Sequence, residues 1–452
     1  MRVALINTRI EQRQHIPMGL LYLAAYIEDI SEVKIFDPEP DDIALQDILA
    51  FNADIIGITS MTQNWPRSKE LIDIIRSGES QPKIVVGGIH STVCGEEVIN
   101  TPGVDAICTG EGEDWLKEYI QNAPDNGGDI APGQTDLKTI PLPAYHLMPQ
   151  IERYIESSSS IRGTKTRSIN IMTSRGCPGG CIYCSSKAIF GLKVRRRTVE
   201  SVIEEIKLVK EKYDANHISF TDDTFPLDED WVIRFCKEVE PLDIKWSCQA
   251  RADSLTEDGV FWMKKSGCVQ IDVGVESGSR RVLKILKKGE SPDDFIRVYA
   301  LLKKHGVRRL ATFVIGTPGE TEEDILETKK LLKIIKPDFT QIFYLTPYPG
   351  TKLQKMCYDN GIKFSISTYG IQDRPVIENP NISPERYAEI RRELYNVVWW
   401  QNIRGYLKLS TFLWFIKNLR PAILKRFLLT WKDKNLYDAM YGFLQDTRKK
   451  SL

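Results

Sequence analysis

A strand followed by a helix repeats six times from residue 168 onward, and this alternation constrains the fold more than any other feature of the chain. The short apolar runs that we expect to form strands occupy residues 168–173, 217–221, 245–250, 269–275, 309–315 and 339–345. Between them lie amphipathic stretches such as VESVIEEIKLVKEKY, in which apolar residues recur at helical spacing. Because alternating strands and helices favour a parallel sheet, we expect a partial (β/α)6 barrel over residues 161–360.

A second series of strands and helices precedes the barrel, over residues 1–124. Its expected strands are 3–7, 33–37, 55–60, 84–88 and 106–109, with helical stretches such as GLLYLAAYIED and SKELIDIIRS between them. This pattern predicts a Rossmann-like, doubly wound α/β domain. Ligands of such sheets bind at the carboxyl ends of the strands, where this chain has small and hydroxyl residues.

Composition excludes several classes of protein. Apolar residues make up 42% and charged residues 27%, which is typical of a globular protein, and Lys plus Arg equals Asp plus Glu at 61 each. This balance gives no indication of a nucleic-acid partner. The N-terminus lacks a signal peptide, and no run approaches the roughly 18 to 20 apolar residues of a membrane span. We therefore expect a cytoplasmic protein.

Three of the nine cysteines form one motif, Cys177-x3-Cys181-x2-Cys184, in the segment SRGCPGGCIYCSS. An odd number of cysteines in a chain without a secretion signal argues against a disulfide framework. A [4Fe–4S] cluster needs a ligand for each iron, and this motif supplies three, so the last iron is either open or ligated from elsewhere. A zinc ion is the alternative to the cluster, but zinc is generally bound by four N or S ligands, and the sequence has no second Cys or His pair.

The triad, with Tyr183 just before its last cysteine, resembles the signature of the radical S-adenosylmethionine (SAM) superfamily. The resemblance implies that SAM binds the open iron, and that one electron, from a donor such as flavodoxin or ferredoxin, cleaves it to a 5′-deoxyadenosyl radical. GVESGSRRVL and FVIGTPGETEED also resemble strand motifs of these enzymes. The SAM contacts implied in this way are Tyr183, Asp222, Arg251, Glu276, Ile315 and Gly316. The usual Gly-Gly-Glu after the second strand is absent, and Thr221-Asp222-Asp223 stands there, with Asp222 implied near the amino group.

HIPMGLLYLAAYIED, GITSMTQ, VVGGIHST and CTGEGE resemble, in order and spacing, the cobalamin-binding domain fused to one large class of radical SAM enzymes. The cobalamin contacts implied in this way are Ser60, Met61, Thr62, Gly87, Gly88, His90, Ser91, Gly110, Glu111 and Gly112. The motif D-x-H-x-x-G, which supplies a lower His ligand in many cobalamin proteins, is absent around His15 and Gly19. We therefore expect a cobalt without a His ligand from the protein and with residues 61–65 facing it.

Residues 125–160 form a linker, and residues 361–452 form an expected helical region without strands. From Leu394 to Lys432 this region contains no acidic residue, while basic and aromatic residues interleave. Two readings stay open: a lid packed over the barrel mouth, or a basic amphipathic surface that makes peripheral contact with a membrane.

The leading functional hypothesis is a cobalamin-dependent radical SAM methyltransferase that methylates an unactivated carbon of a small-molecule or lipid-like substrate. An anaerobic oxidative cyclase or a ring-rearranging enzyme is the alternative, because the same two domains occur in both. A cobalamin carrier or sensor without catalysis would have no reason to keep the cysteine triad. A methylthiotransferase is disfavoured, because the N-terminal region has only Cys94 and Cys108 and no second cluster set.

Overall fold

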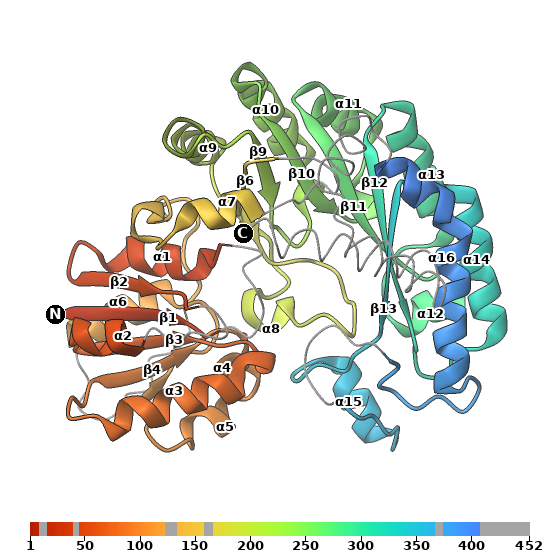
Figure 1. The fold of residues 1–452 in the computed structure, drawn as a ribbon. Coiled ribbons are helices and arrows are strands. Elements are labelled where there is room, and N and C mark those ends of the chain that lie inside the picture. Colours follow the sequence, from red (N-terminus) through yellow and green to blue (C-terminus); the bar gives the residue numbers. More distant parts are fainter. Residues whose placement is uncertain (9–15, 39–44, 123–132, 158–165, 367–373, 407–452) are drawn as a thin grey trace, which may run out of the picture.

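The computed structural model describes residues 1–8, 16–38, 45–122, 133–157, 166–366 and 374–406. It confirms the predicted class: an N-terminal doubly wound α/β unit, a six-stranded parallel sheet with helices, and a helical segment toward the C-terminus. Figure 1 shows the six strands in an arc, with the N-terminal unit across the open side of the arc.

The N-terminal sheet has the strand order β2-β1-β3-β4-β5, and all of its strands are parallel. Its elements are β1 (Arg2–Asn7), α1 (Met18–Ile27), β2 (Glu32–Phe36), α2 (Leu45–Phe51), β3 (Ile55–Thr59), α3 (Trp65–Ser77), β4 (Lys83–Gly87), α4 (Ile89–Val93), α5 (Gly95–Ile99), β5 (Ala106–Ile107) and α6 (Glu113–Asn122). Successive residues of β1 point to opposite faces: Val3 and Leu5 pack in the core that includes α1 and α6, whereas Ala4 and Ile6 pack in the core that includes α3. This division makes the sheet doubly wound.

The second sheet has the order β13-β12-β11-β10-β9-β6 and is parallel throughout. Its strands are β6 (Ser168–Ile171), β9 (His217–Phe220), β10 (Lys245–Ala250), β11 (Cys268–Glu276), β12 (Arg308–Ile315) and β13 (Phe339–Tyr344). The helices before, between and after these strands are α7 (Ile151–Ser157), α8 (Ser186–Phe190), α9 (Val199–Tyr213), α10 (Glu229–Val239), α11 (Glu257–Lys265), α12 (Arg280–Ile285), α13 (Pro292–Lys304), α14 (Glu322–Ile335) and α15 (Lys352–Asp359). Two short strands, β7 (Ser174–Arg175) and β8 (Arg195–Arg196), form a separate two-stranded sheet. β7 and β8 pair antiparallel and enclose the loop that carries the cysteine triad.

Several strands end one or two residues before the expected position, for a physical reason that β6 shows clearly. The sequence predicts a strand to residue 173, but β6 ends at Ile171. The backbone N–H of Thr173 donates to the Asp222 carboxylate instead of to a neighbouring strand. A buried side chain therefore replaces the last ladder hydrogen bonds.

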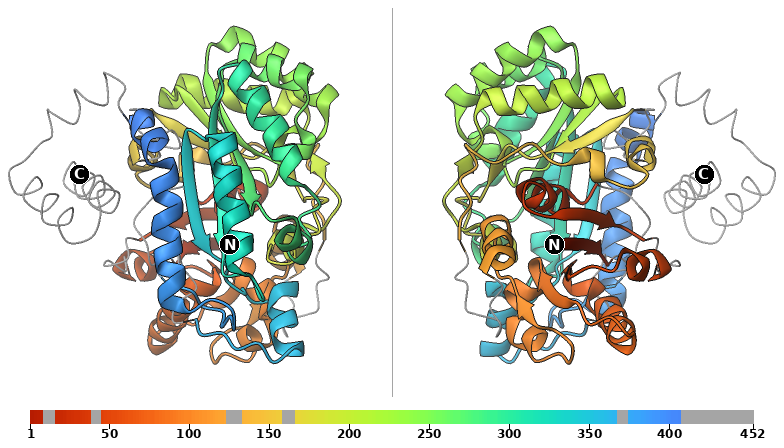
Figure 2. Two further views of the ribbon diagram at one scale, coloured as in Figure 1. Left: turned by 90° about the vertical axis from the view of Figure 1, so that its right-hand side faces the viewer. Right: turned by 90° about the vertical axis from the view of Figure 1, so that its left-hand side faces the viewer.

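The linker and the last helix pack against the barrel. Tyr145 of the linker is buried, and its hydroxyl donates to Glu205 of α9 over 2.6 Å, while the backbone N–H of Ala144 donates to Leu21 of α1. Helix α16 (Pro384–Tyr406) runs along the outside of the barrel beside α14 and β13, as Figure 2 also shows. Of the expected helical region, residues 384–406 are helical, whereas residues 361–366 and 374–383 are not and contain an antiparallel bridge between Phe364 and Ile377. The basic and aromatic segment from residue 407 onward lies outside the described residues.

Among the described residues, no helix is long and apolar enough to cross a membrane.

Candidate functional site

The cysteine triad lies on the loop between β7 and β8, at the carboxyl end of β6. Gly176 opens this loop with φ +95°, and a Cβ at this position would lie 2.4 Å from the carbonyl oxygen of Lys193, so only glycine fits. Cys181 is buried, while Cys177 and Cys184 are half-buried. Burial raises the pKa of Cys177 and of Cys184, and the nearby Asp223 carboxylate adds to the effect.

The spacing of the triad fits a cluster better than a single ion. Among the described residues, Cys177, Cys181 and Cys184 do not form a group whose ligand atoms all lie within 4.8 Å of one another. A tetrahedral zinc with Zn–S bonds of about 2.3 Å would hold its sulfurs closer than this, about 3.8 Å apart. At least one pair of these sulfurs is therefore farther apart than in a site for a single zinc ion, and Cys177, Cys181 and Cys184 are the residues that would hold the larger [4Fe–4S] cluster.

Arg251, which follows β10, reaches the same loop. A Cβ on Gly179 would lie 3.0 Å from Nη1 of Arg251, 3.3 Å from Sγ of Cys177 and 3.8 Å from Sγ of Cys181. The missing side chain at Gly179 thus leaves room where two sulfurs and one guanidinium converge. The structure therefore brings the predicted SAM contact Arg251 to the predicted cluster.

Glu276 is held in an unusual conformation at the end of β11. Its φ is +64°, and the register between β11 and β12 shifts between Gly274 and Glu276, which is typical of a β-bulge that redirects a side chain. Its carboxylate lies 3.3 Å from the ammonium group of Lys288, and both side chains are buried. A Cβ on Gly274 would lie 2.6 Å from Oε1 of Glu276, so the glycine makes room for this ion pair.

Buried charges continue from this pair to Arg251. Lys288 Nζ also lies 3.3 Å from Glu290, and Glu290 lies 3.5 Å from Arg251. Burial alone would lower the pKa of Lys288, but Glu276 and Glu290 outweigh burial and raise it. Burial, together with Glu276 and Cys181, raises the pKa of Tyr183 far above its usual range. Four predicted residues, Arg251, Glu276, Tyr183 and Cys181, therefore meet in one electrostatic cluster.

Asp222, the residue expected near the amino group of SAM, is held by hydrogen bonds within the barrel. It is 1% exposed and accepts hydrogen bonds from the backbone and hydroxyl of Thr173 and from the hydroxyl of Ser174. These bonds tie β9 to the segment after β6. Asp223, the next residue, is exposed, accepts a hydrogen bond from Ser186 and acts electrostatically on Cys177 and Cys184.

The turn after β12 contains the two residues expected near the adenine. Ile315 is fully buried, and Gly316 has φ +91° and nothing within 4 Å of a Cβ built on it. Its backbone N–H donates to Glu320 over 2.8 Å, and the hydroxyl of Tyr387 on α16 donates to the same carboxylate oxygen over 3.0 Å. Burial raises the pKa of Glu320 to about 7. A C-terminal helix therefore helps to shape this turn.

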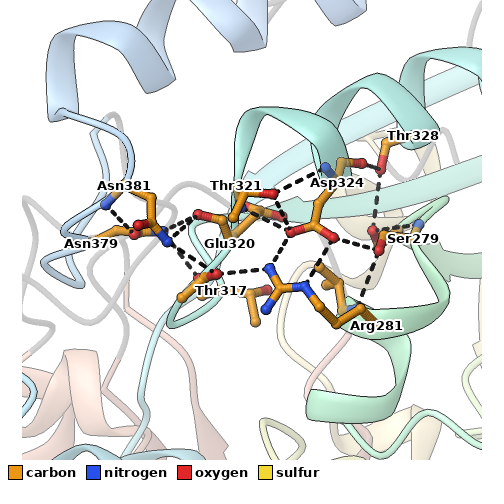
Figure 3. A network of polar contacts seen from close by, with 12 residues as sticks. Ser279, Arg281, Thr317, Glu320, Thr321, Asp324, Thr328, Asn379 and Asn381 are labelled. Atoms are coloured by element: carbon orange, nitrogen blue, oxygen red, sulfur yellow. Dashed lines mark hydrogen bonds and ion pairs between the residues drawn. The ribbon is translucent and has the colours of Figure 1, made fainter.

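Figure 3 shows the wider polar network around the turn. The Asn379 amide donates to the carbonyl oxygens of Thr317 and Glu320, while Asp324 accepts from Ser279 and pairs with Arg281. Burial acts to raise the pKa of Asp324, but these partners outweigh it and lower the pKa to about 2.

The expected cobalamin contacts gather at the carboxyl ends of β3, β4 and β5, which are neighbours in the sheet. Ser60 is buried and bonded to Ser68, while Met61 is 55% exposed. Gly88 has φ +95°, and a Cβ there would lie 2.9 Å from the carbonyl oxygen of Ser60. Several of the remaining candidates make local hydrogen bonds. The hydroxyl of Ser91 donates to the carbonyl oxygens of Gly88 and Cys108, and the backbone N–H of Gly110 donates to Thr92. His90 faces Thr62, and both Gly87 and Gly112 lie near Cys108. The glycines of this edge allow close packing within the chain, since a Cβ on Gly112 would lie 3.1 Å from Leu23 and one on Gly87 would lie 3.7 Å from Cys108.

Glu111 is the exception, because its carboxylate points to the barrel rather than to this edge. It lies 2.8 Å from Arg175 and also pairs with Arg195, while Glu113 lies 2.5 Å from Arg175. The four side chains are between 1% and 14% exposed. These ion pairs engage the side chain of Glu111, and the cobalamin contact at this residue stays a prediction.

These ion pairs place the two sites next to each other. Arg175 precedes Cys177 by two residues, and Glu111 follows β5 of the N-terminal sheet. Helix α8, just after Cys184, contacts α4, and Figure 1 shows α8 between the two units. Sequence reasoning missed Arg175, Arg195, Lys288 and Glu290, because no motif marks a pair formed across domains or across a loop.

Comparisons with known proteins identify the same two domains. The radical SAM superfamily profile matches residues 171–332, and the B12 binding domain profile matches residues 7–120. An uncharacterized methyltransferase of Pyrococcus horikoshii, PH0819, is 32% identical over 84% of this chain and 86% of its own length. The anaerobic magnesium-protoporphyrin IX monomethyl ester cyclase of Rubrivivax gelatinosus is 25% identical over 96% of this chain and 83% of its own length.

Among solved structures, the radical SAM methyltransferase TsrM from Kitasatospora setae, with cobalamin and a [4Fe–4S] cluster bound, matches with a TM-score of 0.70. The match covers 88% of this chain and 90% of TsrM at 16% identity, and it supports the fold. The two domains confirm the predicted cofactors, which are a [4Fe–4S] cluster, SAM and cobalamin. The chain therefore belongs to the family of cobalamin-dependent radical SAM enzymes.

Proposed function

We propose that this enzyme methylates an unactivated carbon of a small-molecule or lipid-like substrate. The observation that carries the proposal is the set of buried ion pairs from Arg175 to Glu111 and Glu113. They join the segment before the cluster loop to the carboxyl end of the N-terminal sheet, so the residues that would hold SAM and those that would hold cobalamin would face one substrate. The methyltransferase relative, similar over 84% of the chain, supports the same reaction.

The chain's own residues would hold SAM from several strand ends. The cysteine triad would hold the cluster, whose chemistry is one-electron reduction of SAM. Arg251 and Glu276, fixed by Lys288 and Glu290, would orient the polar end of SAM, and the turn at Gly316 would lie against the adenine. Because Asp222 is already bonded, we propose Asp223 as the acceptor for the amino group.

A carrier or sensor without catalysis would not need this arrangement. The bulge at Glu276, with its positive φ, and the buried Lys288 beside it are costly features of the barrel, not of the cobalamin domain. Such strain is typical of a site that binds a ligand.

The second candidate is an oxidative cyclase or ring-rearranging enzyme. It is favoured by the relative from Rubrivivax gelatinosus, which is similar over 96% of this chain. That likeness also makes an apolar polycycle, such as a tetrapyrrole, a substrate class to test. Two apolar side chains, Met61 after β3 and Leu192 on the cluster loop, are 55% and 56% exposed and would suit such a surface.

We also propose which partners the enzyme has and where it works. The enzyme would take electrons from a donor such as flavodoxin or ferredoxin and would not bind nucleic acid. It would work in the cytoplasm. The C-terminal region, residues 361–452, would form a lid or, as the alternative, make peripheral contact with a membrane.

A labelling experiment separates the two reactions. The reconstituted enzyme is incubated anaerobically with a reductant, SAM carrying a deuterated methyl group, and lipid or tetrapyrrole extracts. A product that gains one CD3 group in place of one hydrogen supports the methyltransferase. A product that loses hydrogens or gains oxygen, without deuterium, overturns it and supports the cyclase.

A further inference from the structure

Three potential metal ligands meet on the N-terminal unit, away from the cysteine triad. Helices α4 and α5 follow β4, and the chain turns between them at Cys94. One nitrogen of His90, the sulfur of Cys94 and one carboxylate oxygen of Glu97 all lie within 4.8 Å of one another. This is the one such group among the described residues.

His90 is oriented as a ligand. Its side chain is 3% exposed, and its Nε2 has no hydrogen-bond partner among the described residues; the Glu97 carboxylate is 3.8 Å away. Its Nδ1 faces the hydroxyl of Thr62 at 3.4 Å, and the ring lies 4.9 Å from the Trp65 ring. A proton on Nδ1 donated to Thr62 would leave the lone pair of Nε2 directed at Cys94 and Glu97. Burial lowers the pKa of His90, which favours the neutral ring that a metal requires.

Glu97 is fixed from its other side. Its Oε1 accepts a hydrogen bond from the indole N–H of Trp65 over 2.8 Å, and Trp65 is 3% exposed. Oε2 is the oxygen near His90. An outer group that orients a ligating carboxylate or imidazole is a regular feature of metal sites, and here both ligands have one.

We propose that His90, Cys94 and Glu97 bind one Zn²⁺ ion. Nitrogen, thiolate and carboxylate together suit zinc, which holds four ligands in a tetrahedron. Glu97 is 52% exposed at its side chain, so water can reach the fourth position. Zn–ligand bonds would hold the three ligand atoms roughly 3.3 to 3.8 Å from one another, so the distances between these atoms would shorten by about 1 Å when zinc binds.

The ion would itself join α4 to α5, and hydrogen bonds of its ligands would connect it to the segment after β3. Thr62 and Trp65, the outer partners, belong to the segment expected to face the cobalt, so the zinc would fix its position. The proposal assigns the His90 side chain to the metal instead of to cobalamin, whose predicted contacts at Gly87, Gly88 and Ser91 are unchanged. Burial and Glu97 raise the pKa of the Cys94 thiol, so zinc binding releases its proton.

The test uses the holoenzyme with its cluster and cobalamin in place. Elemental analysis after zinc titration should show one zinc per chain beside the iron and the cobalt. Cys94→Ser and Glu97→Gln should each weaken zinc binding at least ~10-fold without changing iron or cobalt. Glu96→Gln, an exposed neighbour, is the matched control and should bind zinc as the wild type does.

Zinc X-ray absorption of the wild type gives a readout that needs no variant. One sulfur at about 2.3 Å with nitrogen and oxygen at about 2.0 to 2.1 Å is expected. Three sulfurs would mean zinc in the cluster motif and would overturn the proposal. Substoichiometric zinc, equal binding by Cys94→Ser, or iron in place of zinc at this site would also overturn it.

Discussion

The guanidinium group of Arg175 lies 2.8 Å from the carboxylate of Glu111, and both side chains are almost completely buried. The pair joins the strand before the cluster loop to the end of the cobalamin-binding sheet. Glu113 also pairs with Arg175, and Arg195 also pairs with Glu111. The cluster therefore holds two buried positive charges and two buried negative charges.

Neutralising one of these charges should loosen the interface. Glu111→Gln leaves two buried guanidinium groups facing one carboxylate. Breaking a buried ion pair in this way lowers the free energy of unfolding by about 3 to 5 kcal/mol. We expect a lower urea midpoint and loss of bound cobalamin. Lys117→Gln, which removes the ion pair with the exposed Asp29, should cost less than about 1 kcal/mol and serves as the control. Equal effects of the two variants would contradict the role of the buried pair.

Gly274→Ala should impair SAM cleavage. The new methyl group would lie 2.6 Å from Oε1 of Glu276 and 3.1 Å from Nζ of Lys288, so the carboxylate must move. A displacement of about 1 Å at a reacting centre can lower the rate by roughly a hundredfold. The measurement is kcat/KM for 5′-deoxyadenosine formation. Gly19→Ala, which meets nothing within 4 Å, should leave this value unchanged.

Substitution of Asp222 should lower the stability of the folded chain, whereas substitution of Asp223 should weaken the binding of SAM. Asp222→Asn weakens the bonds to Thr173 and Ser174 and should cost about 1 to 3 kcal/mol of folding free energy. Asp223→Asn should raise the Kd for SAM, with a change in stability of less than about 0.5 kcal/mol. Thermal unfolding and equilibrium dialysis of both variants test this. A reversed pattern would return the amino-group role to Asp222.

Glu320 should make stability depend on pH. Burial raises its pKa in the folded chain to about 7, from 4.5, so the folded state holds the proton more tightly than the unfolded state does. Its contribution is therefore complete below pH 4.5 and is lost as the pH rises through about 7, to the extent of roughly 3 kcal/mol. Glu320→Gln keeps a hydrogen-bond acceptor for Gly316 and Tyr387 but cannot titrate. The melting temperature of this variant should therefore depend less on pH over this range than that of the wild type. Parallel curves for the two proteins would contradict the assignment.

The fold followed from the sequence because its signals are local and periodic. Alternation in β1 sends Val3 and Ala4 into different cores, and the alternation of strands with helices predicts that both sheets are parallel, as they are. The exact ends were less predictable, since they depend on tertiary bonds such as that from Thr173 to Asp222.

The site residues that the sequence predicts stand in contiguous motifs or directly after a strand. The cysteine triad and Glu276 stand in such motifs, whereas Lys288 meets Glu276 through a loop that returns from α12. The partners Arg175 and Glu111 are 64 residues apart in the chain. No periodicity connects such residues, so only the folded chain brings them together.

The most direct test of the central claim is SAM cleavage by the reconstituted enzyme under anaerobic, reducing conditions, with 5′-deoxyadenosine measured by mass spectrometry. The wild type should form it, Cys181→Ala should form none, and Cys236→Ala, a buried cysteine outside the cluster loop, should retain the activity. Undiminished 5′-deoxyadenosine formation by Cys181→Ala would contradict the assignment of the cluster and of the radical chemistry that depends on it.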